Sequence, residues 1–177
     1  PDDELSFFFS IRNPVSYLQD IAQRAEAETL RDYLGPFHPF ELKWSDVIRR
    51  IKRAAPDAPL HVWCTEDTPL IWEDLIRLQT GVAAKTPLKG RFDVLSRIIS
   101  PEGIAVLKAA SMPDDRVARH DCIADLLDAY AMPDAIEEQI NLPELSPELI
   151  TAMSQSYEDD LALIDDMEGV DLILPFN

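Results

Sequence analysis

The sequence has no long apolar run, and none of its stretches approaches the roughly 20 residues that a membrane-spanning helix needs. We recognise no secretory signal in it either. Its only two cysteines, Cys64 and Cys122, are too few for the disulfide framework of a small secreted domain. We therefore expect free thiols, a cytoplasmic location and no membrane partner.

Basic residues are also scarce. The chain has 16 Lys and Arg against 33 Asp and Glu, a formal net charge of −17, and no Lys or Arg follows Arg119. A chain this acidic is repelled by polyanions, so we expect no nucleic acid partner. Any site that binds an anion is expected in the first half of the chain.

Few residues suggest a metal or a phosphate loop. Five glycines are present, and none has the spacing of a Gly-rich phosphate-binding loop. The three histidines, His38, His61 and His120, match no metal-ligand motif. We therefore expect no bound metal and interpret these histidines as structural.

What the sequence does have is the composition of a globular domain, with 46% hydrophobic residues in 177. An apolar run over 5–11 predicts a strand buried on both faces, which would lie in the centre of a sheet. A helix is expected from Pro14 to about Leu34, with apolar positions that include Ala25.

A second strand and two further helices follow in the first half. Trp44 begins a helix, the run over 60–65 predicts a strand, and a helix over 69–80 is closed by Gly81. Strands joined through helices pair in parallel. The order β-α-α-β-α therefore predicts an α/β fold, a parallel sheet with flanking helices.

The second half is expected to be mainly helical. We predict helices over 91–99, 102–110, 115–130 and 147–167, and a short last strand over 170–174. We interpret the chain as one domain, with an α/β portion over 1–90 and an acidic, mainly helical portion over 91–177 packed on the same core.

The predicted sheet is incomplete in this chain. A strand as apolar as the first one requires neighbours on both edges and helices on both faces. The chain offers one clear further strand and one short one. We therefore expect additional strands, either from residues preceding Pro1 or from another chain.

The segment Arg12-Asn13-Pro14 ends the first strand and begins a helix. Asn is a good N-cap and Pro fits the first helical turn. Ligands of open α/β sheets bind outside the carboxyl ends of strands, and a helix N-terminus beside an arginine suits a phosphate. The alternative is that Arg12 pairs with a nearby carboxylate and that Asn13 is only a cap.

Two segments in the right order resemble those of bacterial PAPS-dependent sulfotransferases. The segment FFFSIRNPVSYLQDI, residues 7–21, resembles their strand, Arg-Asn-Pro turn and helix. The segment over 58–81, APLHVWCTEDTPLIWEDLIRLQTG, is similar to the family's strand, Tyr-Glu-Asp-like turn and helix. The preceding helix that begins at Trp44 also fits.

The resemblance implies a P-loop sulfotransferase-like fold and sulfuryl transfer from PAPS to a hydroxyl or amine of an unknown small-molecule or glycan acceptor. It implies that Arg12 binds the 3′-phosphate of PAPS or of its product PAP. The family's serine eight positions later is Asp20 here, so Ser16, one helical turn earlier, is a candidate in its place. Lys89 and Arg91 resemble part of the family's Arg-Lys-Gly loop and are further candidates.

The family's Gly-rich loop and its catalytic histidine or acid precede the Arg-Asn-Pro strand, and no such segment occurs among these residues. No catalytic residue is therefore assigned. We expect the missing elements in the same place as the missing strands. The alternative function is that of a non-catalytic relative, which keeps the sheet for structure and acts as an interaction module through its acidic helices.

Overall fold

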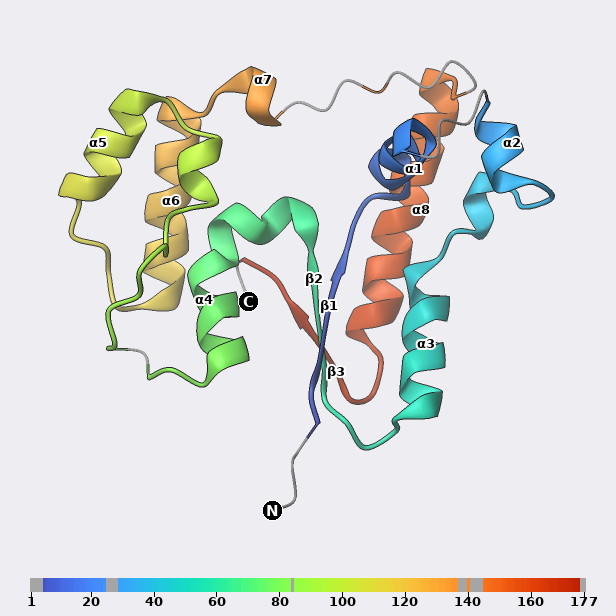
Figure 1. The fold of residues 1–177 in the computed structure, drawn as a ribbon, viewed down its shortest axis with the longest axis horizontal. Helices are drawn as coiled ribbons and strands as arrows, with labels where there is room; N and C mark the ends of the chain where they lie inside the picture. Colours follow the sequence, from blue (N-terminus) through green and yellow to red (C-terminus); the bar gives the residue numbers. More distant parts are fainter. Residues whose placement is uncertain (1–4, 25–28, 84, 137–139, 141–144, 176–177) are drawn as a thin grey trace. The chain divides into compact units, whose positions relative to one another are not determined.

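Three short strands form a parallel sheet in the order β1-β2-β3 (Figure 1). This computed structural model describes residues 5–24, 29–83, 85–136, 140 and 145–175. The strands are β1 (Phe7–Ile11), β2 (Leu60–Cys64) and β3 (Val170–Ile173). The α-helices are α1 (Pro14–Arg24), α2 (Leu30–Leu34), α3 (Trp44–Ala54), α4 (Thr68–Thr80), α5 (Pro101–Ala109), α6 (Arg116–Tyr130), α7 (Pro133–Ile136) and α8 (Pro147–Asp165). The predicted α/β class is confirmed.

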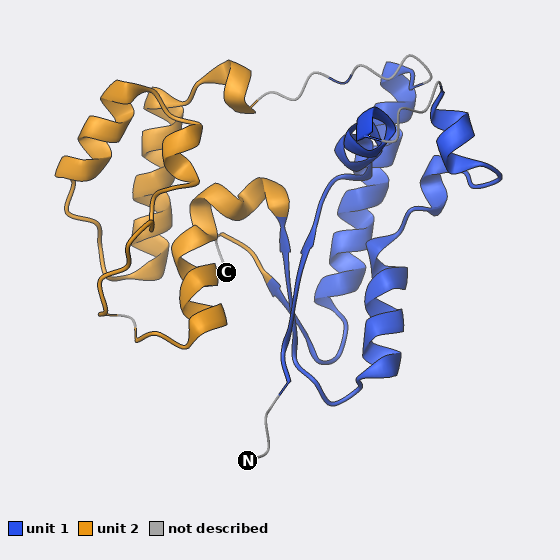
Figure 2. Ribbon diagram, in the orientation of Figure 1, with its two compact units in different colours: residues 1–64, 139–172 blue, residues 65–138, 173–177 orange. Residues whose placement is uncertain are grey.

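The chain forms two compact units (Figure 2). Unit 1 comprises residues 1–64 and 139–172, and therefore holds β1, β2, α8 and nearly all of β3. Unit 2 comprises residues 65–138 and 173–177, with α4 to α7. Each unit is described below by itself.

The first strand is an edge strand among the described residues, and its predicted central position depends on the additional strands that we expect. β1 pairs in parallel with β2, from Phe7 opposite Leu60 to Ile11 opposite Cys64. The three phenylalanines are half-buried and Ser10 is exposed. The apolar run indicated how much surface the strand could bury, whereas its position depends on which strands are present to cover it.

The predicted helix over 14–34 is two helices, α1 and α2. Thr29 is extended, and its side chain accepts a hydrogen bond from the Asp32 amide as the N-cap of α2. Side chains of this type favour helix starts over helix interiors because they satisfy the free amides there. Ala25, which we had placed in the predicted helix, lies outside the described residues.

The helix predicted over 91–99 is also wrong. That segment holds one 3-10 turn, Leu95–Arg97, and its amides bond mostly three residues back, as from Asp93 to the carbonyl of Gly90. The last residue of this segment, Ile99, forms an antiparallel bridge with Ala131. Apolar spacing alone did not reveal this bridge, which joins residues distant in sequence.

The other elements agree with the sequence to within a few residues. Ser146 caps α8 by accepting from the Leu149 amide, and Asp115 caps α6 by accepting from the Ala118 amide. Gly81 ends α4 in the left-handed region, with φ of 66°. These ends are well predicted because a single side chain or glycine determines each of them.

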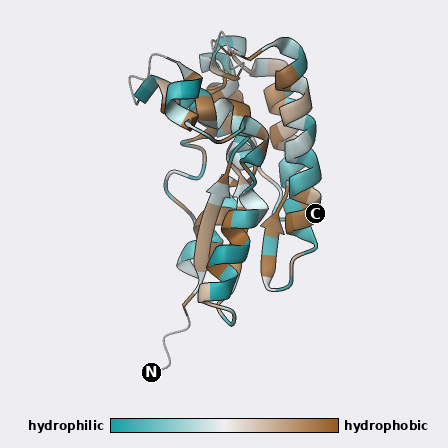
Figure 3. Ribbon diagram, turned by 90° about the vertical axis from the view of Figure 1, so that its right-hand side faces the viewer, coloured by the Kyte–Doolittle hydropathy of each residue, from teal (hydrophilic) through white to brown (hydrophobic). Residues whose placement is uncertain are grey.

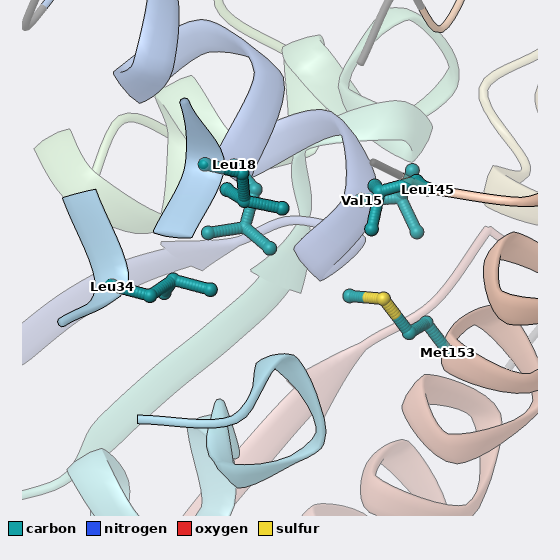
Figure 4. Packing of buried hydrophobic residues seen from close by; sticks show 6 residues of the cluster. Val15, Leu18, Leu34, Leu145 and Met153 are labelled. Carbon is teal, nitrogen blue, oxygen red and sulfur yellow. The ribbon is translucent and has the colours of Figure 1, made fainter. Parts of the chain in front are cut away.

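A hydrophobic cluster in unit 1 joins α1 and α2 to α8 (Figure 4). Its buried members are Val15, Leu18, Leu30, Leu34, Leu145 and Met153. Figure 4 shows the side chain of Met153 reaching from α8 towards Val15 of α1. This packing fixes the start of α1, and with it the turn that follows β1.

Unit 2 has its own cluster, formed by α5, α6 and the segment before α5. Its buried members are Leu95, Ile99, Leu107, Ile123 and Leu126.

The strand arrows are mostly brown in Figure 3, while the helices carry both hydrophobic and hydrophilic residues, as amphipathic helices do. Among the described residues, no helix combines the length and the apolar character that crossing a membrane requires.

Candidate functional site

Hydrogen bonds to three helices hold the turn after β1 in place. The indole Nε1 of Trp44 in α3 donates to the carbonyl oxygen of Arg12 at 2.6 Å. The side-chain oxygen of Asn13 accepts from the Val15 amide at 3.0 Å, as expected of an N-cap. The amide nitrogen of Asn13 donates to the hydroxyl of Ser154 in α8 at 3.1 Å. The turn is therefore fixed to α1, α3 and α8 at once.

Arg12 forms an ion pair with Asp20, through Nη1 and Oδ2. Both side chains are partly exposed, at 25% and 34%. The alternative interpretation of Arg12, pairing with a nearby carboxylate, therefore describes this structure. The contact also shows that a residue eight positions after the arginine lies within reach of its guanidinium.

Ser16 lies in α1, one turn before Asp20. Residues four apart on a helix share a face. Ser16 is therefore on the side of α1 that faces Arg12, and it is half-buried. The structure thus brings two of the four predicted binding residues to one side of α1.

An anion that approached Arg12 would meet opposing fields. The positive end of the α1 dipole and the guanidinium of Arg12 attract it, while the carboxylate of Asp20 repels it. Binding there requires that the Arg12 guanidinium exchange its contact with Asp20 for one with the ligand.

The other two predicted residues belong to unit 2 and are described within it. Lys89 is exposed. Arg91 is half-buried and stacks on Phe92, with its guanidinium carbon 4.2 Å from the ring centroid. The Nε of Arg91 lies 3.5 Å from Oε2 of Glu73. Arg91 is therefore part of an ion-pair cluster that the sequence did not reveal.

Two adjacent carboxylates of α4, Glu73 and Asp74, organise this cluster. Oε1 of Glu73 accepts from Arg77 Nη2 at 2.7 Å and Nε at 3.2 Å. Its Oε2 lies 3.8 Å from Nε of Arg119. The side chain of Glu73 is 11% exposed, so arginines and not water surround most of its carboxylate.

Asp74 holds the residues of α6. Its Oδ1 accepts from Arg119 Nη2 at 2.5 Å, and its Oδ2 accepts from Arg116 Nε at 3.2 Å. Nε2 of His120 lies 2.7 Å from Oδ2, and Nδ1 of the same ring contacts the carbonyl oxygen of Pro175. His120 is fully buried, which agrees with its predicted structural role.

We define the Glu73–Asp74 cluster as Glu73, Asp74, Arg77, Arg91, Arg116, Arg119 and His120. One signal for it was present in the sequence, since Glu73 and Arg77 stand four apart on a predicted helix. The remaining partners come from other elements, 17 or more positions away. The packing of α4 against α6 brings Arg116, Arg119 and His120 to it, and the segment before α5 supplies Arg91.

A cavity of about 460 Å³ lies beside this cluster. It is lined by Glu73, Asp74, Arg77, Lys85, Thr86, Pro87, Arg91, Met112, Pro113, Asp114, Arg116 and Arg119. All of these residues belong to unit 2. Lys89 is not part of the lining, so of the predicted Lys89–Arg91 pair only Arg91 faces the cavity.

Within the described ranges, no three or more His, Cys, Asp or Glu side chains gather as metal ligands would. In comparisons with known proteins, no family model, no curated protein and no solved structure matches the chain.

Proposed function

We propose that this chain is part of a P-loop sulfotransferase-like protein that transfers a sulfuryl group from PAPS to a hydroxyl or amine of a small-molecule or glycan acceptor. One observation supports this function above the others: the side chain at position 20 contacts the guanidinium of Arg12. The resembling family places the serine that shares the donor's 3′-phosphate with its arginine at this position.

In this proposal the residues after β1 bind the donor and do not carry out the chemistry. Arg12 holds the 3′-phosphate through two of its N–H groups, the mode in which guanidinium binds phosphate best. The hydroxyl of Ser16 donates a further hydrogen bond from the same face of α1. Asn13 and Trp44 position the turn through the contacts described above.

The reaction forms a bond between sulfur and the acceptor oxygen or nitrogen, and breaks the bond between sulfur and the 5′-phosphate oxygen. PAP leaves with the electron pair of that bond. The acceptor's proton passes to a base that we do not assign to any residue of this chain.

Asp20 gives the second candidate function its support. A guanidinium already paired with a carboxylate is a weaker phosphate site, and this pairing suits a non-catalytic relative that retains the turn for structure. Such a protein would act through its acidic helices as an interaction module. The two functions differ in whether Arg12 exchanges Asp20 for a phosphate.

The test is a calorimetric titration of the full-length gene product with PAP. Asp20→Ser restores the family's serine and removes the competing charge, so we expect it to tighten PAP binding by about ten-fold, the equivalent of about 1.4 kcal/mol. Arg12→Ala should weaken binding by about ten-fold to a hundred-fold, because hydrogen bonds to charged groups contribute about 1.5–3 kcal/mol.

Asp46→Ser is the matched control, since Asp46 also pairs with an arginine, Arg49, at 2.8 Å on the exposed face of α3. It should leave PAP affinity unchanged. Equal PAP affinity in the wild type, Asp20→Ser and Arg12→Ala would remove Arg12 from the donor site. Absence of binding in all of them would favour the interaction module.

We also propose the cytoplasm as the location of this protein. Cys64 is buried and Cys122 is exposed, and both are free thiols. An exposed free thiol persists best in a reducing compartment.

A further inference from the structure

The cavity of unit 2 described above has a positively charged lining, although the chain as a whole is acidic. Its lining carries five cationic side chains, Arg77, Lys85, Arg91, Arg116 and Arg119, against the three carboxylates of Glu73, Asp74 and Asp114. The cavity therefore has an excess of two positive charges, in a chain whose formal net charge is −17. Concentrating cations in one concave place raises the local concentration of anions.

Three of the arginines are committed to the protein. Arg77 donates to Glu73 and to the carbonyl oxygens of residues 83 and 86, at 2.8 and 3.1 Å. Arg119 donates to Asp74 and to the Asp114 carbonyl. Arg116 donates to Asp74 and to the carbonyl oxygen of residue 174. These three arginines keep their positive charge in the cavity wall, but most of their N–H groups already donate to acceptors of the protein.

Lys85 and Arg91 differ from these three. In the part of the chain that the structure describes, Lys85 and the two terminal nitrogens of Arg91 make no hydrogen bond. The Nε of Arg91 is buried without a hydrogen-bond acceptor, and its nearest carboxylate oxygen, Glu73 Oε2 at 3.5 Å, is buried without a donor. Both residues line the cavity.

We infer that this cavity binds the phosphate group of a small molecule, with Lys85 and Arg91 as the residues that contact it. A phosphate dianion matches the excess of two positive charges, and the planar fork of a guanidinium matches two of its oxygens. The contact of Arg91 with the Phe92 ring restricts the movement of that fork before the ligand arrives. The Glu73–Asp74 cluster holds the other cations in place, which lowers the ordering cost of binding.

The volume and the uncharged lining suit the rest of such a molecule. About 460 Å³ is well above the space that a phosphate alone fills and lies within the range of small-molecule sites. Pro87, Met112 and Pro113 form an apolar part of the wall, against which a carbon skeleton can pack.

This inference does not rest on the proposed function, since it uses no residue of unit 1. It assigns Arg91 to this cavity and leaves the donor's 3′-phosphate to Arg12. The two proposals can fail separately, because Arg12→Ala should leave phosphate binding in this cavity unchanged.

The experiment is an NMR titration of the ¹⁵N-labelled full chain with inorganic phosphate at pH 7.5 and low chloride. Saturable shifts are expected in the amides near Lys85 and Arg91. Lys85→Ala should weaken phosphate binding by about ten-fold, and Arg91→Gln by about ten-fold to a hundred-fold, because each removes a charged hydrogen-bond donor. Raising the ionic strength should weaken it as well.

Lys108→Ala is the matched control, because Lys108 is an exposed lysine of α5 in the same unit and does not line the cavity. It should bind phosphate as the wild type does. Lys85→Ala removes no hydrogen bond or ion pair with any residue that the structure describes, so we expect the variant to fold as the wild type does. The spectrum of each variant without phosphate should match that of the wild type, which checks that the variant is folded.

Sulfate and acetate complete the test. Sulfate is a tetrahedral dianion and should bind within about ten-fold of phosphate, whereas acetate should bind far more weakly. Equal phosphate affinity in the wild type, Lys85→Ala and Arg91→Gln would overturn the inference. So would acetate binding as tight as phosphate binding, because the excess of two charges would then have no effect.

Discussion

Asp74 should be among the most important side chains for the stability of unit 2. Its carboxylate accepts hydrogen bonds from Arg116 and Arg119 and contacts Nε2 of His120. Asp74→Ala removes all of these contacts at once. The side chains of Arg119 and His120 are 10% and 0% exposed, so water cannot easily replace the lost carboxylate.

The expected loss follows from this burial. Breaking a buried ion pair by removing one partner costs about 3–5 kcal/mol, because the other charge stays behind unpaired. Asp74 itself is 19% exposed, which places the loss near the lower end, about 3 kcal/mol. In a chain of this length each kcal/mol lowers Tm by about 2–4 °C, so Tm should fall by about 6–12 °C.

Urea and thermal unfolding, followed by circular dichroism, measure this loss. The control is Asp46→Ala, which breaks an exposed pair with Arg49 and should cost at most about 1 kcal/mol. Asp74→Asn keeps the shape and removes only the charge, so it should fall between the two. If Asp74→Ala costs no more than Asp46→Ala, the cluster does not stabilise unit 2 and our reasoning about its buried arginines fails.

Two further predictions concern packing and pH. Gly103→Ala should destabilise the protein by about 1–3 kcal/mol in urea unfolding, because a Cβ at this position of α5 would lie 2.6 Å from Cβ of Tyr130. This clash should outweigh the helix propensity, which favours Ala over Gly. A stabilised variant would contradict the packing of α5 on α6. Burial, and then the charge of Tyr33, raise the pKa of Tyr17 above its ordinary value of 10.0. The unfolded chain then releases the Tyr17 proton at a lower pH than the folded chain does, so the free energy of unfolding should decrease as the pH rises above about 10. Tyr17→Phe should reduce that decrease. An identical pH dependence of the wild type and of Tyr17→Phe would contradict this prediction.

The sequence predicted those parts of the fold that local signals determine. Ser146 and Asp115 cap the helices that they were expected to begin, and Gly81 ends α4. The strands at 60–64 and 170–173 also lie where their apolar residues indicated. Each of these depends on the residues within one turn or one strand.

The failure over 91–99 has a different cause. This segment forms a bridge at Ile99 in place of a helix. The outcome depends on Ala131, which is far away in the sequence. Periodicity describes which face of a segment is apolar, and it contains no information on what will cover that face.

The candidate sites divide in the same way. The pairing of Arg12 with a carboxylate was foreseeable, because Asp20 lies in the helix that follows this arginine. The Glu73–Asp74 cluster was not, because its arginines come from α4, α6 and the segment at 91. We had instead considered Lys89, which the structure places in an exposed position outside the cavity.

The two proposed anion sites differ in what a ligand must displace. At Arg12 a phosphate competes with Asp20, a carboxylate already in contact, so its net gain is the difference between two ion pairs. At Lys85 and Arg91 it meets donors that have no hydrogen-bond partner among the described residues, and the nearest carboxylate to the Nε of Arg91 is at the longer distance of 3.5 Å. The Nε of Arg91 is buried without an acceptor, which costs stability, and an anion that binds only the folded protein would stabilise it. Inorganic phosphate should therefore stabilise unit 2 before it affects the turn at Arg12.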